Sequence, residues 1–242
     1  PRSTLFPYTT LFRSHIEKFP EDIISEIDVQ KFFEENLDND QKEFFKKNKQ
    51  VDFAVMKDEV RFRVNGYLSS TGNNFVARKI ETEIPAIEKL GLPEAMLEIM
   101  KYDNGLVLVT GPTGSGKSTS LAALINKLNE DRQGNIITVE DPIEYVHPSK
   151  KCIVSQREVG RDAVSFAHAL KAMLREDPDI ILVGEMRDME TISLALTAAE
   201  TGHLVFGTLH TNGAANSINR IIDVFPSEQQ AQIRAQLSQS LR

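Results

Sequence analysis

Residues 106–119 have the sequence LVLVTGPTGSGKST. The first four form an apolar run, which is typical of a parallel strand buried on both faces. Residues 111–118 then follow the pattern G-x-x-x-x-G-K-[ST], and apolar residues such as Leu121 and Leu124 recur at helical spacing after it. In the order strand, glycine-rich loop and helix, this pattern forms a loop that binds phosphate groups. The stretch therefore predicts an α/β fold built around a phosphate-binding site.

Each part of this loop has an expected role. The glycines let consecutive backbone N–H groups turn toward the phosphates, and the following helix adds its positive N-terminus. We expect Lys117 to reach the β- and γ-phosphates and the Ser118 hydroxyl to bind Mg²⁺. The alternative, a glycine-rich turn with an exposed lysine, is disfavoured by the flanking strand and helix. The expected nucleotide-binding residues are Gly111, Pro112, Thr113, Gly114, Ser115, Gly116, Lys117, Ser118 and Thr119.

The nucleotide is expected to be ATP. Proteins that bind GTP normally carry an N-K-x-D motif that recognises guanine. The nearest approach is residues 126–129, Asn-Lys-Leu-Asn, which lack the aspartate and fall inside an expected helix. The absence of the guanine motif from the sequence therefore favours ATP, with Mg²⁺ as its metal.

Two other apolar runs end in carboxylates that can complete the site. Residues 180–183 are followed by Gly184, where such strands usually carry an aspartate, and by Glu185. Residues 136–139 are followed by Glu140. Parallel strands bring their carboxyl ends to one edge of a sheet, where ligands bind. We expect Glu185 to contact the metal directly or through water, and either Glu140 or Glu185 to orient the attacking water.

Two histidines bracket the strand expected at residues 204–209. His203 precedes this strand and His210 follows it. Because side chains alternate along a strand with a period of two, the two histidines cannot share a face, and we expect them to do different work around the phosphates. His147 and His168 have no such context and are expected to be structural. Sets of Cys and His at the spacing of a structural zinc site are absent from the sequence.

Composition narrows the class of protein. The chain has 242 residues, 40% of them hydrophobic and 26% charged, with a formal net charge of −7. This profile is that of a globular protein and disfavours binding to duplex DNA. The single cysteine excludes an internal disulfide and favours a reducing compartment. No apolar run approaches the ~18 residues of a membrane span, so we expect a cytoplasmic protein that meets a membrane only through partners.

The chain divides into three expected parts. Residues 1–14 repeat Thr-Leu-Phe and are expected to be an artefact rather than natural sequence. Residues 15–84 combine surface helices with alternating strands over residues 51–80, which predicts a partial α+β domain. Residues 85–242 alternate strands and helices and are expected to be an α/β core that breaks off within a helix. The core strands are expected at residues 106–109, 136–139, 180–183 and 204–209.

Four stretches together resemble the type II/IV secretion and pilus-motor ATPase family. The resemblance covers about residues 30–242, and the stretches are residues 111–119, 137–147, 177–188 and 197–211. Within the family the chain is most similar to the ATPases of pilus retraction and twitching motility. Assembly and type II secretion ATPases, which usually differ in the places that carry this similarity, are the alternative. Those places are residues 156–159, 184–188 and 223–228.

The resemblance implies a RecA-like P-loop core joined to an N-terminal PAS-like domain. It implies a homo-hexameric ring that powers pilus retraction through an inner-membrane platform protein, without nucleic acid. In this comparison Glu185 is the Walker B carboxylate, and Glu140 is the carboxylate of the aspartate box. His203 and His210 are the histidine-box pair that senses nucleotide state.

Arginines of the N-terminal domain are also implied to reach the phosphates. Arg61, Arg63 and Arg78 match the family positions, whereas Thr71 stands where a further arginine is common. An arginine in this role can raise a hydrolysis rate by ~10³–10⁵. The plain alternative is that these arginines are solvated strand residues.

Two other functions stay open from the sequence. A RecA-like ATPase that handles nucleic acid is disfavoured by the acidic charge and by the lack of basic residues interleaved with aromatic ones. A nucleotide-binding module with poor turnover is the second possibility, since catalysis in this family draws on residues of neighbouring subunits.

Overall fold

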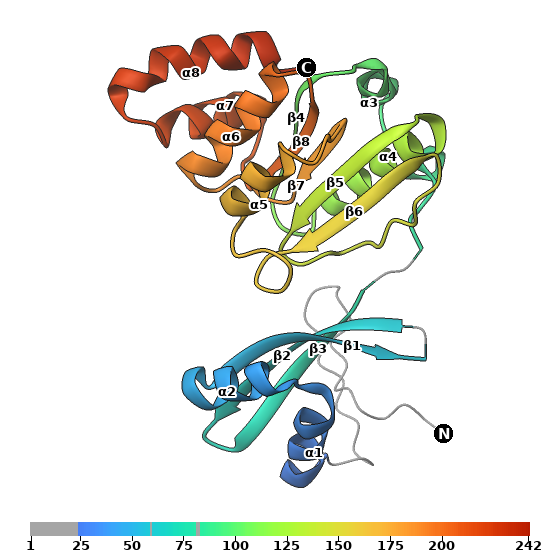
Figure 1. Cartoon of the computed structure of the whole chain (residues 1–242), viewed down its shortest axis with the longest axis vertical. Coiled ribbons are helices and arrows are strands. Elements are labelled where there is room, and N and C mark those ends of the chain that lie inside the picture. The colour runs from blue at the N-terminus through green and yellow to red at the C-terminus, as the bar shows by residue number, and fades with distance from the viewer. Residues whose placement is uncertain (1–23, 59, 81–82) are drawn as a thin grey trace. The chain divides into compact units, whose positions relative to one another are not determined.

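The computed structural model describes residues 24–58, 60–80 and 83–242. The expected artefact at residues 1–14 lies outside this part, as do residues 15–23 of the expected first domain. The chain forms two compact units, with the boundary between Thr82 and Glu83 (Figure 1). The expected domain boundary, after residue 84, lies two positions further along.

Within the described part of the smaller unit, three antiparallel strands form a sheet in the order β1-β2-β3. These are β1 (Gln50–Lys57), β2 (Val60–Ser69) and β3 (Gly72–Ile80). Helices α1 (Glu26–Asn36) and α2 (Asn39–Asn48) pack on one face of the sheet through an aromatic core that includes Phe32, Phe33, Phe53 and Phe75. The alternation of apolar and polar residues in the strands creates this face. The predicted strands are confirmed, and the PAS-like assignment stays a prediction.

Within the described part of the larger unit, five parallel strands form a sheet in the order β4-β8-β7-β5-β6. They are β4 (Gly105–Thr110), β5 (Gly134–Glu140), β6 (Cys152–Glu158), β7 (Ile180–Val183) and β8 (Leu204–Leu209). Helix α4 (Lys117–Asp131) covers one face, together with the short segments η1 (Ile87–Leu90), α3 (Glu94–Glu98) and η2 (Ile99–Lys101). The other face packs against α5 (Phe166–Met173), α6 (Met189–Glu200), α7 (Ala214–Asp223) and α8 (Ser227–Ser240) (Figure 1). The α/β fold with four predicted core strands is confirmed.

The structure corrects two expectations about the larger unit. Strand β6 was not predicted, because an edge strand is partly exposed and its sequence lacks a continuous apolar run. Helix α8 does not continue to the last residue: it ends at Ser240, and Leu241 is extended. Leu241 forms a bridge to Leu106, and the backbone N–H of Arg242 donates to the Leu106 carbonyl at 3.0 Å. The unpaired edge of β4 supplies these backbone partners.

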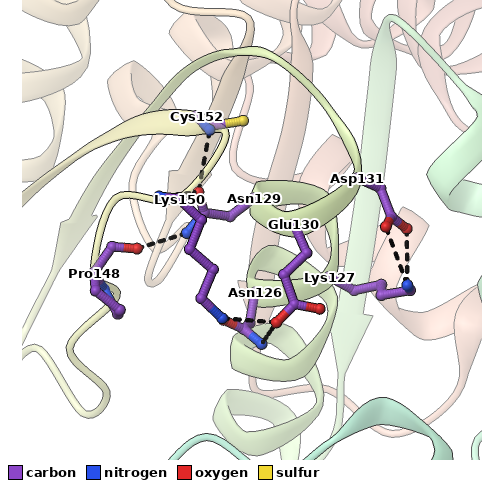
Figure 2. Close-up of polar contacts among 8 residues, drawn as sticks. All are labelled: Asn126, Lys127, Asn129, Glu130, Asp131, Pro148, Lys150 and Cys152. Atoms are coloured by element: carbon purple, nitrogen blue, oxygen red, sulfur yellow. Dashed lines mark hydrogen bonds and ion pairs between the residues drawn. The ribbon is translucent and has the colours of Figure 1, made fainter.

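The P-loop helix α4 is fastened to the segment that connects β5 with β6. Figure 2 shows the Asn129 side chain between Pro148 and Cys152. Its Nδ2 donates to the Pro148 carbonyl at 2.7 Å, and its Oδ1 accepts the backbone N–H groups of Lys150 and Cys152 at 3.0 and 3.3 Å. Nearby, Lys150 Nζ lies 2.7 Å from a Glu130 carboxylate oxygen. Asn129 is fully buried, so this contact fixes the connecting segment onto α4.

Replacing Asn129 by leucine is expected to destabilise the larger unit by roughly 2–4 kcal/mol, because one carbonyl and two N–H groups lose their partner. Urea unfolding of the full-length protein measures this effect. Asn126→Leu is the matched control: its partners Lys150 and Glu130 lie in a partly exposed network, so its cost is expected to stay below about 1 kcal/mol. Equal unfolding midpoints for the two variants would contradict a structural role for the Asn129 contact.

Candidate nucleotide-binding site

The glycine-rich loop lies between β4 and α4, as the sequence predicts. Gly114 and Gly116 have φ angles of +79° and +91°, a region that favours glycine. Helix α4 begins at Lys117, whose Nζ donates to the carbonyls of Gly111 and Pro112 at 2.7 and 3.1 Å. Residues 112–116 are exposed. The loop therefore presents its backbone to solvent at the positive end of a helix, which is the geometry of an anion-binding site.

A chain of contacts connects this loop with Glu185. The Glu185 carboxylate Oε1 lies 3.5 Å from His210 Nε2, and His210 Nδ1 lies 3.4 Å from the hydroxyl of Thr113 in the loop. The same oxygen of Glu185 forms an ion pair with Arg187 Nε at 2.5 Å. Strand β8 lies next to β4 and β7, so His210 at its end reaches both neighbours. Arg187 is a partner of Glu185 that the sequence did not assign.

Glu140 lies on the other side of the site, near Ser118. Both residues line a cavity of about 40 Å³ together with Tyr145 and Thr208. Burial raises the pKa of the Glu140 carboxyl above its usual value, while hydrogen bonds from Thr138, from Gln156 and from the Glu144 backbone act in the opposite direction. The space beside Ser118 is large enough for a water molecule, with polar partners around it.

Tyr145 is a residue of this region that sequence reasoning missed. Its hydroxyl lies 3.1 Å from the Thr119 hydroxyl on α4, and it therefore connects the segment after Glu140 with the P-loop helix. A tyrosine in a connecting segment carries no sequence signal of such a contact, because the partners lie 26 positions apart.

Gly184 lies where the backbone of β5 approaches closely. A Cβ atom at this position would lie 3.0 Å from both the Glu140 Cα and the Val139 carbonyl oxygen. A side chain here, such as the aspartate that these strands usually carry, would push the neighbouring backbone of β5 away by a few tenths of an ångström. The carboxylates of this edge are therefore supplied by Glu140 and Glu185.

The structure corrects the expected place of His203. Its ring Nδ1 lies 2.8 Å from the Ala198 carbonyl and 3.2 Å from the Thr201 hydroxyl, at the carboxyl end of α6. His203 precedes β8 and His210 follows it, so the two are roughly 20 Å apart along the strand. His203 therefore does not surround the P-loop of its own chain.

The three arginines predicted to reach phosphates share one face of the sheet in the smaller unit. Arg63 pairs with Arg78 across β2 and β3, and Arg61 lies two positions before Arg63. This face is opposite to the one that carries Val64 and the helices. Arg63 Nε lies 3.6 Å from the Asp52 carboxylate. The gathering of the arginines is consistent with an anion-binding face, and their role in catalysis stays a prediction.

His147 is buried at the edge of the cavity. In the part of the chain that the structure describes, its Nδ1 is a buried atom without a hydrogen-bond partner. Burial first, and the charge of Lys150 second, lower the pKa of His147 from 6.5 to about 4. The ring is therefore neutral at pH 7, and the structural role expected for His147 stays a prediction.

This lowered pKa predicts a loss of stability in acid. Between pH 6.5 and about 4, the unfolded chain binds a proton at His147 and the folded chain does not, so the free energy of unfolding falls as the pH falls. The total loss from this group is about 3 kcal/mol. Urea unfolding at several pH values should show a weaker dependence in His147→Phe than in the unaltered protein. His168→Phe, at an exposed position, is the control, and equal pH dependence in all three proteins would contradict the prediction.

A parallel sheet with this loop after β4, and with carboxylates at the carboxyl ends of β5 and β7, defines a P-loop nucleotide-binding protein with a RecA-like core. The family model described as Type II/IV secretion system protein matches residues 33–242, and the chain belongs to this family. The predicted family resemblance is thereby confirmed.

Pilus-retraction ATPases are among the individual relatives that match. The "Type IV pilus retractation ATPase PilT" of Pseudomonas aeruginosa is 54% identical over 207 residues, which are 85% of this chain and 60% of that protein. A structure described as the pilus retraction motor PilT with bound ADP has a TM-score of 0.85 at 52% identity, covering 88% of this chain and 62% of its own. The type II secretion system protein E of Xanthomonas campestris is 42% identical over 176 residues, 70% of this chain and 30% of that protein.

These comparisons confirm the RecA-like core and the similarity to pilus-retraction ATPases. The chain spans about 60% of the length of the PilT proteins that it matches. Across the described ranges, none of the helices has the length and apolar character needed to cross a membrane.

Proposed function

We propose that this chain is the greater part of an ATP-hydrolysing motor that retracts type IV pili. The observation that carries the proposal is the contact chain from Thr113 through His210 to Glu185, in a protein 54% identical to PilT. This arrangement couples the phosphate-binding loop to a carboxylate on a neighbouring strand. A nucleotide-driven motor needs such coupling, because loss of the γ-phosphate must change the conformation of residues outside the phosphate-binding loop.

The loop residues 111–119 are proposed to bind ATP. The Lys117 ammonium would exchange the Gly111 and Pro112 carbonyls for phosphate oxygens, which are stronger acceptors. Hydroxyl and carboxylate oxygens suit Mg²⁺, so Ser118 and Glu185 would hold the metal that neutralises phosphate charge. Either Glu185 or Glu140 would orient the attacking water, and the products are ADP and phosphate.

The complete motor is proposed to be a homo-hexamer with nucleotide between subunits. Arg61, Arg63 and Arg78 would reach phosphates from the N-terminal domain, and their common sheet face supports a joint role. His210 would sense nucleotide through Thr113 and Glu185. His203, at the opposite edge of its own sheet, would have to act across a subunit boundary.

The partner is proposed to be an inner-membrane platform protein of the pilus, which the motor binds from the cytoplasmic side. Nucleic acid is not proposed as a partner. The test is to express the full-length protein in a bacterium that lacks its own retraction ATPase and to measure twitching and fibre retraction. Recovery of both is expected. Recovery of pilus extension or type II secretion without retraction would favour the assembly or secretion alternative. ATPase activity stimulated by DNA at physiological salt would instead support a nucleic-acid function.

A further inference from the structure

Gln156 on β6 has every polar group of its side chain engaged. Its Nε2 donates to Glu140 Oε1 at 3.1 Å and to the Tyr145 carbonyl at 2.9 Å. Its Oε1 accepts the backbone N–H of His147 at 2.7 Å. A flipped amide would place its oxygen against two acceptors, so the chemistry of the partners fixes this orientation.

The sheet register brings Gln156 to this position. Thr138 on β5 is the register partner of Gln156, and Glu140 lies two residues after Thr138. Because side chains alternate along strands, all three project from the same face of the sheet. The face is the one covered by α4, since Ile136 and Val154, two residues earlier on each strand, pack into the same core as that helix. Gln156 therefore points to the side of the sheet that carries the P-loop helix.

Through these contacts Gln156 holds both the Glu140 carboxylate and the segment between β5 and β6. It holds the Glu140 carboxylate at the cavity that Ser118 also lines. It also anchors residues 145 and 147 of the connecting segment, and Tyr145 in turn reaches the Thr119 hydroxyl on α4 at 3.1 Å. The amide thus links the carboxylate, to which the Thr138 hydroxyl also donates at 2.7 Å, with the segment that follows it.

We propose that Gln156 is a positioning residue for ATP hydrolysis, which aims Glu140 into the cavity beside Ser118 and fixes the segment between β5 and β6 that contacts the P-loop helix. This inference rests on the proposed function, in which Glu140 takes part in turnover. Gln156 does not line the cavity that Glu140 and Ser118 line, and it acts through Glu140 and the segment that carries Tyr145 and His147.

The amide also supports the charged form of Glu140. Burial, and to a smaller extent the charge of Glu144, favour the protonated carboxyl. The hydrogen bonds from Thr138, from Gln156 and from the Glu144 backbone favour the carboxylate. Loss of the Gln156 donor therefore raises the pKa of Glu140 further. Activity that depends on the Glu140 carboxylate should then need a higher pH.

The experiment compares Gln156→Leu and Gln156→Glu in the full-length hexamer, with kcat, KM for ATP and the pH profile as measurements. In Gln156→Leu we expect kcat at pH 7 to fall on the order of tenfold and the KM to change by less than about threefold. The midpoint of the acid limb should shift to a pH about one unit higher, as for the loss of one charge-assisted hydrogen bond. In Gln156→Glu the midpoint of the acid limb should shift to a still higher pH, because two neighbouring carboxylates share a proton.

The matched control is Gln236→Leu. Gln236 Nε2 also donates to a glutamate, Glu200, at 3.0 Å, but on the exposed surface of α8 and α6. Its kinetics should be unchanged. Gln156 variants that match this control, or that raise KM while kcat stays constant, would overturn the inference. If Gln156→Leu does not fold, Gln156→Glu decides, since it keeps the length of the side chain and the acceptor for the His147 N–H.

Glu140→Gln separates this inference from the function on which it rests. Full turnover in Glu140→Gln would remove Glu140 from the mechanism and with it the proposed role of Gln156. Loss of turnover in Glu140→Gln, together with normal kinetics of the Gln156 variants, would overturn only the positioning role.

Discussion

The Lys117→Ala protein is expected to lose ATP turnover almost completely, with a fall in kcat/KM of at least about 10³. Lys117 is the cation proposed to meet the phosphates where negative charge grows during hydrolysis, and a charge held in place there stabilises the transition state. Its ammonium already lies at the loop, on the carbonyls of Gly111 and Pro112. Titration with a fluorescent ATP analogue measures nucleotide binding, and an assay of phosphate release measures turnover.

Lys127→Ala is the matched control for this prediction. Lys127 lies on the same helix and pairs with Asp131 at 3.0 Å, away from the loop. Its loss removes an exposed ion pair, which costs at most about 1 kcal/mol. If Lys117→Ala binds and hydrolyses ATP as well as Lys127→Ala does, residues 111–119 are not the nucleotide site.

The Glu185→Gln protein is expected to bind ATP normally and to hydrolyse it about 10²–10³ times more slowly. The amide keeps the size of the side chain but loses the charge that can orient a water molecule or hold Mg²⁺. Its contacts with Arg187 and His210 would also weaken. Single-turnover hydrolysis, with nucleotide binding measured separately, shows whether the loss lies in the chemical step.

Comparison with Glu140→Gln decides between the two candidate carboxylates. Glu200→Gln, at an exposed position on α6, is the control and should leave turnover unchanged. A large loss of turnover in Glu140→Gln, with near-normal turnover in Glu185→Gln, would indicate that Glu140 activates the water. Comparable losses in both would indicate that one carboxylate holds the metal and the other orients the water.

The core elements and the phosphate-binding loop were predictable from local sequence. A short segment holds both signals, an apolar run longer than three residues and a glycine pattern at fixed spacing. Residues 105–131 alone therefore predict β4, the loop and α4. The positions of Glu140 and Glu185 at one edge follow from the rule that parallel strands share a direction. These features need no knowledge of which strand is next to which.

The partners of these residues were decided by the tertiary structure. The strand order puts β8 between β4 and β7, and this order brings His210, at the end of β8, between Thr113 and Glu185. His203 lies at the start of β8, away from the loop. The register of β5 with β6 places Gln156 beside Glu140. The sequence by itself determined the loop, the strands and the carboxylates, since these depend on neighbouring residues. Only the tertiary structure determined their contacts, because strand order and register join side chains that are far apart in the chain.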